Sequence, residues 1–156
     1  MKISIGADGH LPVIDSVLNY LKDKGHEITW YGPDSLEDGF VPYPDVARRV
    51  AEDVANGEAA DGVIFCWTGT GVTISANKVP GIRAALCDDA ETARGARLWN
   101  NANVICMSMR RTSEVIASEI LDMWFKTSYK LGEDPNTDAA LVQLYKLDRF
   151  PKLSKD

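Results

Sequence analysis

Residues 66–78 read CWTGTGVTISANK, in which a cysteine is followed closely by a glycine-threonine turn. The apolar run 62–66 before the turn predicts a buried strand, and residues 72–77 after it predict a helix. A strand, a glycine turn and a helix in this order form the building unit of α/β domains. The stretch therefore indicates the fold class and marks a place where a functional site would lie.

The turn itself, Gly69-Thr70-Gly71, has two interpretations. Glycines let a backbone approach a ligand closely, and the first N–H groups of a helix have no partner inside it. Together these features form a cradle for a phosphate or an oxyanion. The alternative is a plain structural turn. Cys66 is likewise either a thiol activated by the turn or a buried packing residue, as most buried cysteines are.

Short β-prone runs alternate with amphipathic segments along the chain. The runs cover residues 3–7, 27–31, 62–66, 83–87 and 103–107. Apolar residues at helical spacing follow at 13–21, 46–54, 115–124 and 135–148. Because parallel strands need crossovers, this alternation predicts an α/β fold: a doubly wound, Rossmann-like sheet of five parallel strands in three α/β/α layers.

We expect residues 1–156 to form a single domain. The helix at about 135–148 would bury Leu141, Leu144 and Tyr145, and it is available to pack on a partner subunit.

The carboxyl ends of parallel strands meet at one edge of a sheet, and ligands bind where the strand order reverses. The long connection 32–44, which holds three of the seven prolines, is expected to fold near this rim. The predicted strands place five chemically useful side chains at this rim: Asp8, Cys66, Asp88, Asp89 and Ser108.

Composition argues against several classes of function. A net charge of −6 disfavours nucleic-acid binding, which needs clustered Lys and Arg. No apolar run approaches the roughly 20 residues of a membrane span, and no signal-like segment opens the chain. Three cysteines without Cys-x-x-Cys spacing and two histidines argue against a structural zinc site. We expect a cytoplasmic protein with reduced thiols and with no metal, cofactor, membrane or nucleic-acid partner.

A nucleotide site fits the turn poorly. The dinucleotide fingerprint Gly-x-Gly-x-x-Gly belongs after the first strand, and its third glycine position here holds Ile74. A Walker loop would need Gly-Lys-Ser/Thr, which does not follow. A nucleotide-binding domain is therefore the weakest hypothesis.

Residues 62–89, GVIFCWTGTGVTISANKVPGIRAALCDD, resemble the core of the ribose-5-phosphate isomerase B and galactose-6-phosphate isomerase family. The resemblance extends to IGAD at 5–8, Tyr43-Pro44-Asp45, NNANV at 100–104, Arg110 and ILDMWF at 120–125. It covers most of the chain, and its central motif is long and specific.

The resemblance implies an aldose–ketose isomerase that works through a cis-enediolate. Cys66 would be the base that removes a proton beside the carbonyl. The N–H groups of Gly69, Thr70 and Gly71 would hold the developing oxyanion, and Thr68 would orient the substrate oxygens. The substrate would be a sugar or a sugar phosphate, and no cofactor would be needed.

The same resemblance implies further substrate contacts and an assembly. Asp8 and Asn100 would bind sugar hydroxyls, and Tyr43 would line the site. Arg110 matches an arginine that contacts phosphate from the neighbouring subunit, with a surface ion pair as the alternative. A homodimer or a dimer of dimers is expected, with each site completed by a neighbouring chain.

The sequence departs from the family pattern at several positions. Trp67 stands where a glycine is usual, and Trp99 replaces the ring-opening histidine. His10 is displaced by one residue and is either a surface turn residue or a replacement acid. The family's Gly-Gly-Arg-His is absent, and Glu133 and Asp134 stand in its place, where they would repel a phosphate dianion.

The remaining tryptophans and cysteines are expected to have simpler roles. Trp67 and Trp99, at predicted rim positions, would stack on a sugar face, whereas Trp30 and Trp124 are expected in the core. Two further residues, Cys87 and Cys106, are expected to be buried thiols in the core.

Two functions from different classes therefore stay open. The first is an isomerase with an altered substrate preference, favoured by Cys66, Thr68 and the glycines. The second is a non-catalytic sugar-binding module or partner subunit of a mixed isomerase assembly, favoured by Trp99 and the missing arginines.

Overall fold

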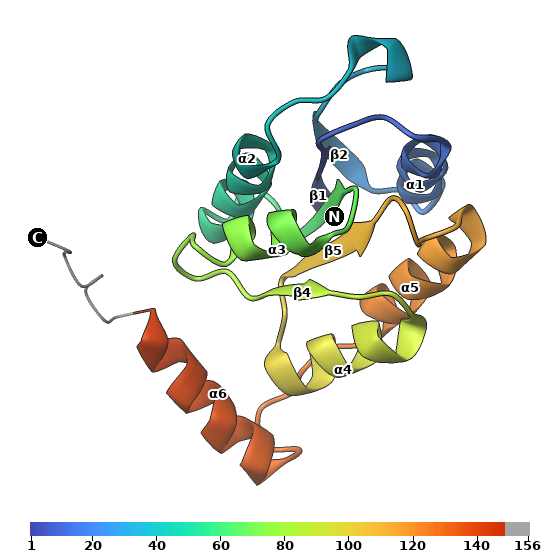
Figure 1. The fold of residues 1–156 in the computed structure, drawn as a ribbon. Coiled ribbons are helices and arrows are strands. Elements are labelled where there is room, and N and C mark those ends of the chain that lie inside the picture. The colour runs from blue at the N-terminus through green and yellow to red at the C-terminus, as the bar shows by residue number, and fades with distance from the viewer. Residues whose placement is uncertain (149–156) are drawn as a thin grey trace, which may run out of the picture.

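The computed structural model describes residues 1–148 and contains one five-stranded parallel sheet (Figure 1). The strands run β2-β1-β3-β5-β4 across the sheet. Every neighbouring pair is parallel. This confirms the expected doubly wound, Rossmann-like α/β fold. The strand bounds are β1 Lys2–Ala7, β2 Glu27–Tyr31, β3 Asp61–Cys66, β4 Ala84–Leu86 and β5 Val104–Ser108.

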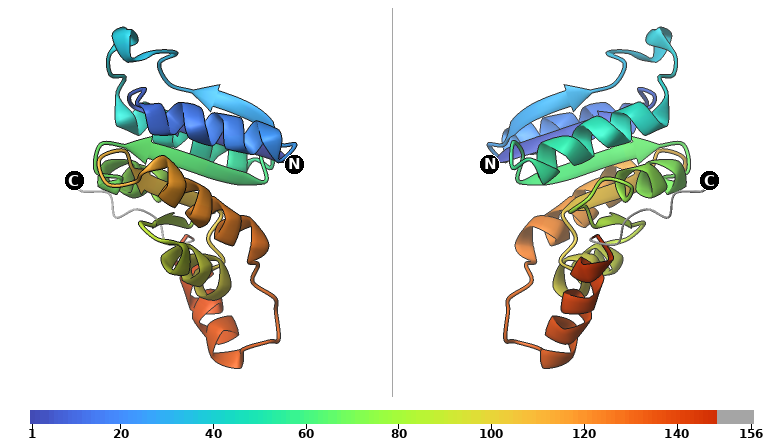
Figure 2. Two further views of the ribbon diagram at one scale, coloured as in Figure 1. Left: turned by 90° about the vertical axis from the view of Figure 1, so that its right-hand side faces the viewer. Right: turned by 90° about the vertical axis from the view of Figure 1, so that its left-hand side faces the viewer.

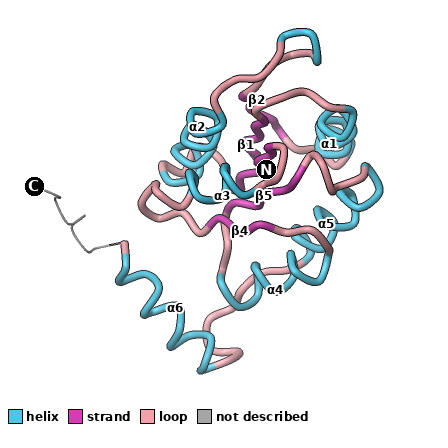
Figure 3. The backbone as a smooth tube through the Cα atoms, viewed as in Figure 1, coloured by secondary structure: helices cyan, strands magenta, loops and turns pink. Residues whose placement is uncertain are grey.

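Helices cover both faces of the sheet, which gives the three expected layers (Figures 2 and 3). Helices α1, α4 and α5 contribute to one buried apolar cluster, and α2 and α3 to the other. Among the described residues, no helix is both long enough and apolar enough to cross a bilayer. The helix bounds are α1 Pro12–Asp23, α2 Tyr43–Ala55, α3 Thr70–Ala76, α4 Ala90–Asn100, α5 Glu114–Lys126 and α6 Pro135–Leu147, with a single 3-10 turn at Leu36–Asp38.

Helix α4 lies between the fourth and fifth strands, where the sequence analysis identified no helix. Its buried face consists of the small residues Ala93, Gly95 and Ala96 rather than of large apolar side chains. Small residues leave no strong apolar periodicity in the sequence. The local signal that remains is the cap, because the Asp89 side chain accepts a hydrogen bond from the Thr92 N–H at 2.7 Å.

Helix α6 stands at the edge of the molecule beside α4 (Figure 1). Leu141 is buried as expected, whereas Leu144 is 36% exposed and Val142 is 54% exposed. The expected burial of Leu144 is therefore wrong within one chain. A partner subunit on this helix stays a prediction.

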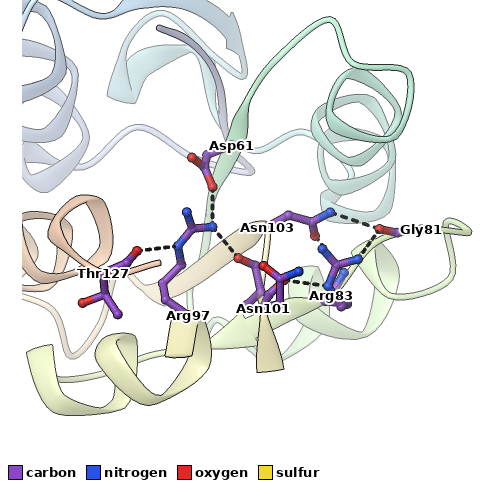
Figure 4. Close-up of polar contacts among 8 residues, drawn as sticks. Asp61, Gly81, Arg83, Arg97, Asn101, Asn103 and Thr127 are labelled. Atoms are coloured by element: carbon purple, nitrogen blue, oxygen red, sulfur yellow. Dashed lines mark hydrogen bonds and ion pairs between the residues drawn. The ribbon is translucent and has the colours of Figure 1, made fainter. Parts of the chain in front are cut away.

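Arg97 of α4 joins several segments at the amino edge of the sheet (Figure 4). Its Nη1 donates to Asp61 Oδ1 at 2.9 Å and to the Ala102 carbonyl at 2.6 Å. Its Nε donates to the Thr127 carbonyl at 3.2 Å, and its guanidinium lies 4.8 Å from the centre of the Trp124 ring. The planar fork of arginine thus links α4, the start of β3, the start of β5 and the end of α5.

The carboxyl group of Asp61 depends on this arginine. The Asp61 side chain is 7% exposed and that of Arg97 is 19% exposed. Burial raises the pKa of Asp61, and the nearby charge of Arg97 offsets part of that increase. Removing the arginine would leave a buried carboxylate without its counter-ion.

We expect Arg97→Ala to lower the free energy of unfolding by about 3–5 kcal/mol, the usual cost of breaking a buried ion pair. Arg94→Ala is the matched control, because Arg94 also lies on α4, pairs with Glu91 and stacks on a tryptophan, yet its side chain is 36% exposed, against 19% for Arg97. Urea unfolding followed by circular dichroism measures both variants. Equal losses in the two would contradict the role given to the Arg97–Asp61 pair.

Candidate active site

The carboxyl edge of the sheet brings Asp8 and Cys66 together. Strands β1 and β3 are neighbours, with Ala7 paired to Phe65, and the Asp8 N–H donates to the Phe65 carbonyl at 3.4 Å. Asp8 therefore lies beside Cys66 across the sheet. The strand order reverses at β1 and β3, which is where ligands bind in doubly wound sheets.

All three cysteines are buried, but Cys66 is 5% exposed whereas Cys87 and Cys106 are fully covered. Cys66 is the last residue of β3 and packs in the cluster formed with α2 and α3. Burial, reinforced by the charges of Asp89 and Asp88, raises the pKa of Cys87 to about 12. Burial also raises the pKa of Cys106 to about 12. The expected core role of Cys87 and Cys106 is confirmed, and Cys66 is the thiol that the fold brings to the rim.

The glycine turn has a backbone that only glycine adopts without strain. Gly69 has a φ of +76°, and a Cβ there would lie 2.5 Å from Leu86 Cδ1. The Thr73 hydroxyl donates to the Gly69 carbonyl at 2.7 Å and so fixes the turn to helix α3. Within residues 1–148, the N–H groups of Gly69, Thr70 and Gly71 make no backbone hydrogen bond outside the helix, and the first turn of a helix offers none inside it.

Polar and aromatic side chains surround this turn. The Thr68 and Thr70 hydroxyl oxygens are 2.7 Å apart. The Tyr43 ring lies against Gly71, because a Cβ on that glycine would come within 2.9 Å of Tyr43 Cε2. The turn is therefore bordered by two hydroxyls that share a hydrogen bond and by one aromatic ring.

Trp67 and Arg110 also lie at this rim. The Trp67 carbonyl accepts from the Ser108 hydroxyl at 2.8 Å and from the Arg110 N–H at 3.1 Å. The Trp67 side chain is 49% exposed, so its ring is available to a ligand. The neighbouring Arg111 pairs with Asp88 at 2.9 Å.

The Asp8 carboxyl has an unused acceptor. Its Oδ1 is buried and has no hydrogen-bond partner. Burial raises the pKa of Asp8, and a hydrogen bond from its own backbone N–H offsets part of the effect. Because an unpaired buried oxygen is unfavourable, a ligand hydroxyl that donates to Oδ1 would be bound strongly.

The connection between β2 and α2 folds onto this rim, as expected. The Val41 N–H donates to the Asp8 carbonyl at 2.8 Å. The Phe40 ring lies against Gly9, where a Cβ would come within 2.5 Å of Phe40 Cε1. Phe40 is 68% exposed and is a candidate site residue that the sequence analysis missed. The available signal was the glycine inserted in Asp8-Gly9-His10.

His10 is buried, so its interpretation as a surface turn residue is wrong. Its Nδ1 lies 2.9 Å from the Pro33 carbonyl and its Nε2 lies 2.9 Å from Asp15 Oδ1. Burial lowers the pKa of His10, but the Asp15 and Pro33 hydrogen bonds and the charges of Asp15 and Asp34 outweigh it, so the pKa is raised overall. Its role as a ring-opening acid stays a prediction, and a nitrogen would have to leave its present partner to serve it.

Trp99 and Asn100 do not join this cluster within one chain, so the predicted rim position of Trp99 is wrong, and the sugar contact of Asn100 stays a prediction. They are the last residues of α4, which begins at the rim and spans about 16 Å at 1.5 Å per residue. The Trp99 ring lies over Gly95 and beneath the Arg94 guanidinium, 5.6 Å from it. The error follows from the missed helix, which carries these side chains to the amino edge.

Glu133 and Asp134 also lie near Trp99, around a shallow groove of about 220 Å³. Glu133 pairs with Lys130 at 3.2 Å. Asp134 caps α6 by accepting from the Asn136 N–H at 3.0 Å and from the Thr137 hydroxyl at 2.6 Å. Both carboxylates thus have partners within the chain. Among the described residues, no three acidic, histidine or cysteine side chains are placed to hold a metal ion.

Comparisons with known proteins match nearly the whole described chain. The Ribose/Galactose Isomerase family matches residues 3–140. A galactose-6-phosphate isomerase subunit from Clostridium acetobutylicum is 45% identical over 83% of this chain and 75% of its own length. A D-erythrulose-4-phosphate isomerase from Pectobacterium atrosepticum is 38% identical over 85% of this chain and 87% of its own length. The solved structure of Clostridium thermocellum ribose-5-phosphate isomerase B superposes with a TM-score of 0.87 at 34% identity, covering 96% of this chain and 98% of that one.

The contrast among the thiols gives a direct test. At pH 8 a thiol with a pKa of about 12 is ionised in roughly one molecule in ten thousand, so iodoacetamide should spare Cys87 and Cys106 in the native protein. Mass spectrometry should find Cys66 alkylated first, and all three cysteines alkylated in urea. Native labelling of Cys87 or Cys106 before Cys66 would rule out this assignment.

Proposed function

The chain belongs to the ribose/galactose isomerase family, and we propose that it is an aldose–ketose isomerase acting on a sugar or sugar phosphate. One observation carries the proposal: the thiol of Cys66, the carboxyl group of Asp8 and the open glycine turn meet at the point where the strand order reverses. A base, an acceptor for hydroxyls and a cradle for an oxyanion are what the reaction requires.

In the proposed mechanism, Cys66 as thiolate removes the proton from the carbon beside the carbonyl. The electron pair of that C–H bond forms the carbon–carbon double bond of the enediolate, and negative charge moves to the carbonyl oxygen. Backbone N–H groups of Gly69, Thr70 and Gly71 stabilise that charge. Cys66 then returns the proton to the neighbouring carbon, and the hydroxyl proton passes between the two oxygens, so no net charge or redox equivalent is left over.

The nearby polar side chains have supporting roles in this proposal. Thr68, whose hydroxyl is hydrogen-bonded to that of Thr70, orients the two reacting oxygens of the sugar. Asp8 accepts a hydrogen bond from a sugar hydroxyl at its unpaired Oδ1. Tyr43 and Trp67 border the sugar face. The reaction moves only protons, so these side chains suffice without a cofactor.

We further propose that the site is completed by a second copy of the chain, in a homodimer or a dimer of dimers. Trp99 and Asn100 stand at the opposite edge of the sheet, so they could contact the sugar at Cys66 only from another copy. Arg110 lies at the rim beside Trp67. Its contact with a phosphate is proposed across the same interface. The exposed apolar side chains of α6 are consistent with a covered surface there.

A non-catalytic partner subunit is the second candidate function. It is favoured by the relative that is itself called a subunit of galactose-6-phosphate isomerase, and by Trp99 in place of an ionisable side chain. Incubation with sugars and sugar phosphates in deuterium oxide separates the two candidates. An isomerase exchanges the proton beside the carbonyl, which NMR detects, whereas a binding subunit does not.

We expect Cys66→Ala to lower kcat by about 10²–10⁴, the usual cost of losing a positioned acid–base group, while leaving the fold intact. Cys87→Ala is the control, because that thiol is buried and protonated. Exchange and turnover on one sugar compare both variants with the wild-type protein. If Cys66→Ala kept nearly full activity, Cys66 would be a packing residue.

We also expect ribose 5-phosphate to be a poor substrate, relative to a free sugar or to one whose charge is placed elsewhere. Phosphate binding favours several arginine donors, and the α5–α6 connection presents Glu133 and Asp134 instead. A shorter sugar phosphate such as D-erythrulose 4-phosphate, named for one relative, brings its charge closer to the rim. Values of kcat/KM for these sugars provide the comparison, and a clear preference for ribose 5-phosphate would refute the expectation.

A further inference from the structure

A closed ring of contacts joins the glycine turn to the edge strand β4. It begins at Gly69, whose carbonyl accepts from the Thr73 hydroxyl at 2.7 Å. The Thr73 carbonyl accepts from Asn77 Nδ2 at 3.1 Å, and Asn77 bonds the backbone of Ala84. Two residues further along β4, Leu86 returns to Gly69, where its Cδ1 fills the space of a side chain.

Asn77 closes the ring because its amide pairs with both backbone groups of one residue. Its Nδ2 donates to the Ala84 carbonyl at 2.8 Å, and its Oδ1 accepts from the Ala84 N–H at 2.9 Å. Strand β4 pairs with β5 on one side only, so its other edge is open. The amide therefore acts as a short substitute for a neighbouring strand and holds β4 against α3.

The position of β4 determines how tightly Gly69 is held. Side chains two residues apart on a strand lie on the same face, so Ala84 and Leu86 both face α3. The Leu86 methyl group lies so close to Gly69 that a Cβ there would be 2.5 Å away. An outward movement of Ala84 would draw Leu86 away from Gly69. The turn would then no longer be held in the left-handed conformation of Gly69.

We propose that Asn77 is a positioning residue for the isomerase reaction. It fixes β4 against α3, β4 seats Leu86 on Gly69, and the seated turn aims its N–H groups at the developing oxyanion. The inference rests on the proposed function, because it names what holds the catalytic turn. Donors that stabilise a transition state must be placed within a fraction of an ångström, and a misplacement of about 1 Å can lower the rate about 100-fold.

Asn103 provides a matched control in the same strand region. Its Oδ1 accepts from the Arg83 N–H at 2.8 Å, and its Nδ2 donates to the Gly81 carbonyl at 3.0 Å. It therefore makes the same pair of amide-to-backbone bonds next to Ala84, as Figure 4 shows for its bond to Gly81. Asn103 lies just before β5, at the amino edge, and is not part of the ring.

The experiment compares Asn77→Ala, Asn103→Ala and Leu86→Ala with D-erythrulose 4-phosphate, ribose 5-phosphate and galactose 6-phosphate as probes. We expect Asn77→Ala and Leu86→Ala to lower kcat about 10- to 100-fold with KM changed less than about twofold. A sugar-acid hydroxamate, whose planar anionic end resembles the enediolate, should lose affinity by the same factor as kcat. Asn103→Ala should lower the melting temperature as much as Asn77→Ala and leave kcat unchanged.

Equal kcat losses in Asn77→Ala and Asn103→Ala, or no loss in Asn77→Ala, would overturn the proposal. A second readout does not need activity: the amide NMR signals of Gly69 and Gly71 should shift in Asn77→Ala and Leu86→Ala but not in Asn103→Ala. If the wild-type protein exchanges no substrate proton, the proposed function fails, and the amide NMR signals alone then test whether Asn77 positions the turn. Unchanged signals in Asn77→Ala would then refute the positioning role.

Discussion

The buried ion pair between Arg97 and Asp61 determines which side chains of this protein can meet. It fixes the carboxyl-terminal end of α4 to the first residue of β3, at the amino edge of the sheet. Because α4 starts at the opposite edge, the helix must run the full depth of the sheet. Trp99 and Asn100 lie two and three residues after Arg97 on the same helix, so the pair also fixes their distance from Cys66. Within one chain, the sheet itself separates the two groups of candidate residues.

This separation gives the chain two incomplete half-sites. The carboxyl edge has a thiol, an unpaired carboxylate oxygen and an open glycine turn, but its tryptophan is half exposed. The amino edge has an aromatic ring and polar side chains around a groove, and none of the described residues that line this groove is a cysteine. In the proposed function, the reacting groups at one edge and the aromatic and polar side chains at the other are complementary. In a symmetric dimer, the carboxyl edge of each chain would face the amino edge of the other, so that two complete sites would form.

The sequence allowed the fold to be predicted, together with the place of Cys66 and the glycine turn between a strand and a helix, because both depend on local patterns. Apolar runs of strand length and the spacing of Cys66 from Gly69 are visible in one stretch of chain. Helix α4 was missed because it buries alanine and glycine rather than large side chains. The partners of His10 and the amide contacts of Asn77 could not be predicted, because they join residues whose proximity only the folded chain reveals.

The α5–α6 connection shows how such contacts change the meaning of a sequence feature. From the sequence, Glu133 and Asp134 are simply two negative charges where a phosphate would need positive ones. In the folded chain, Asp134 caps α6 and Glu133 pairs with Lys130. Asp138 accepts from the Gly132 N–H at 3.0 Å and fixes the same connection. The Lys130–Glu133 pair is exposed, and it offsets one of the two negative charges within the connection. The connection is therefore held in place by its own polar contacts, and residues 127–134 offer no arginine to a phosphate dianion.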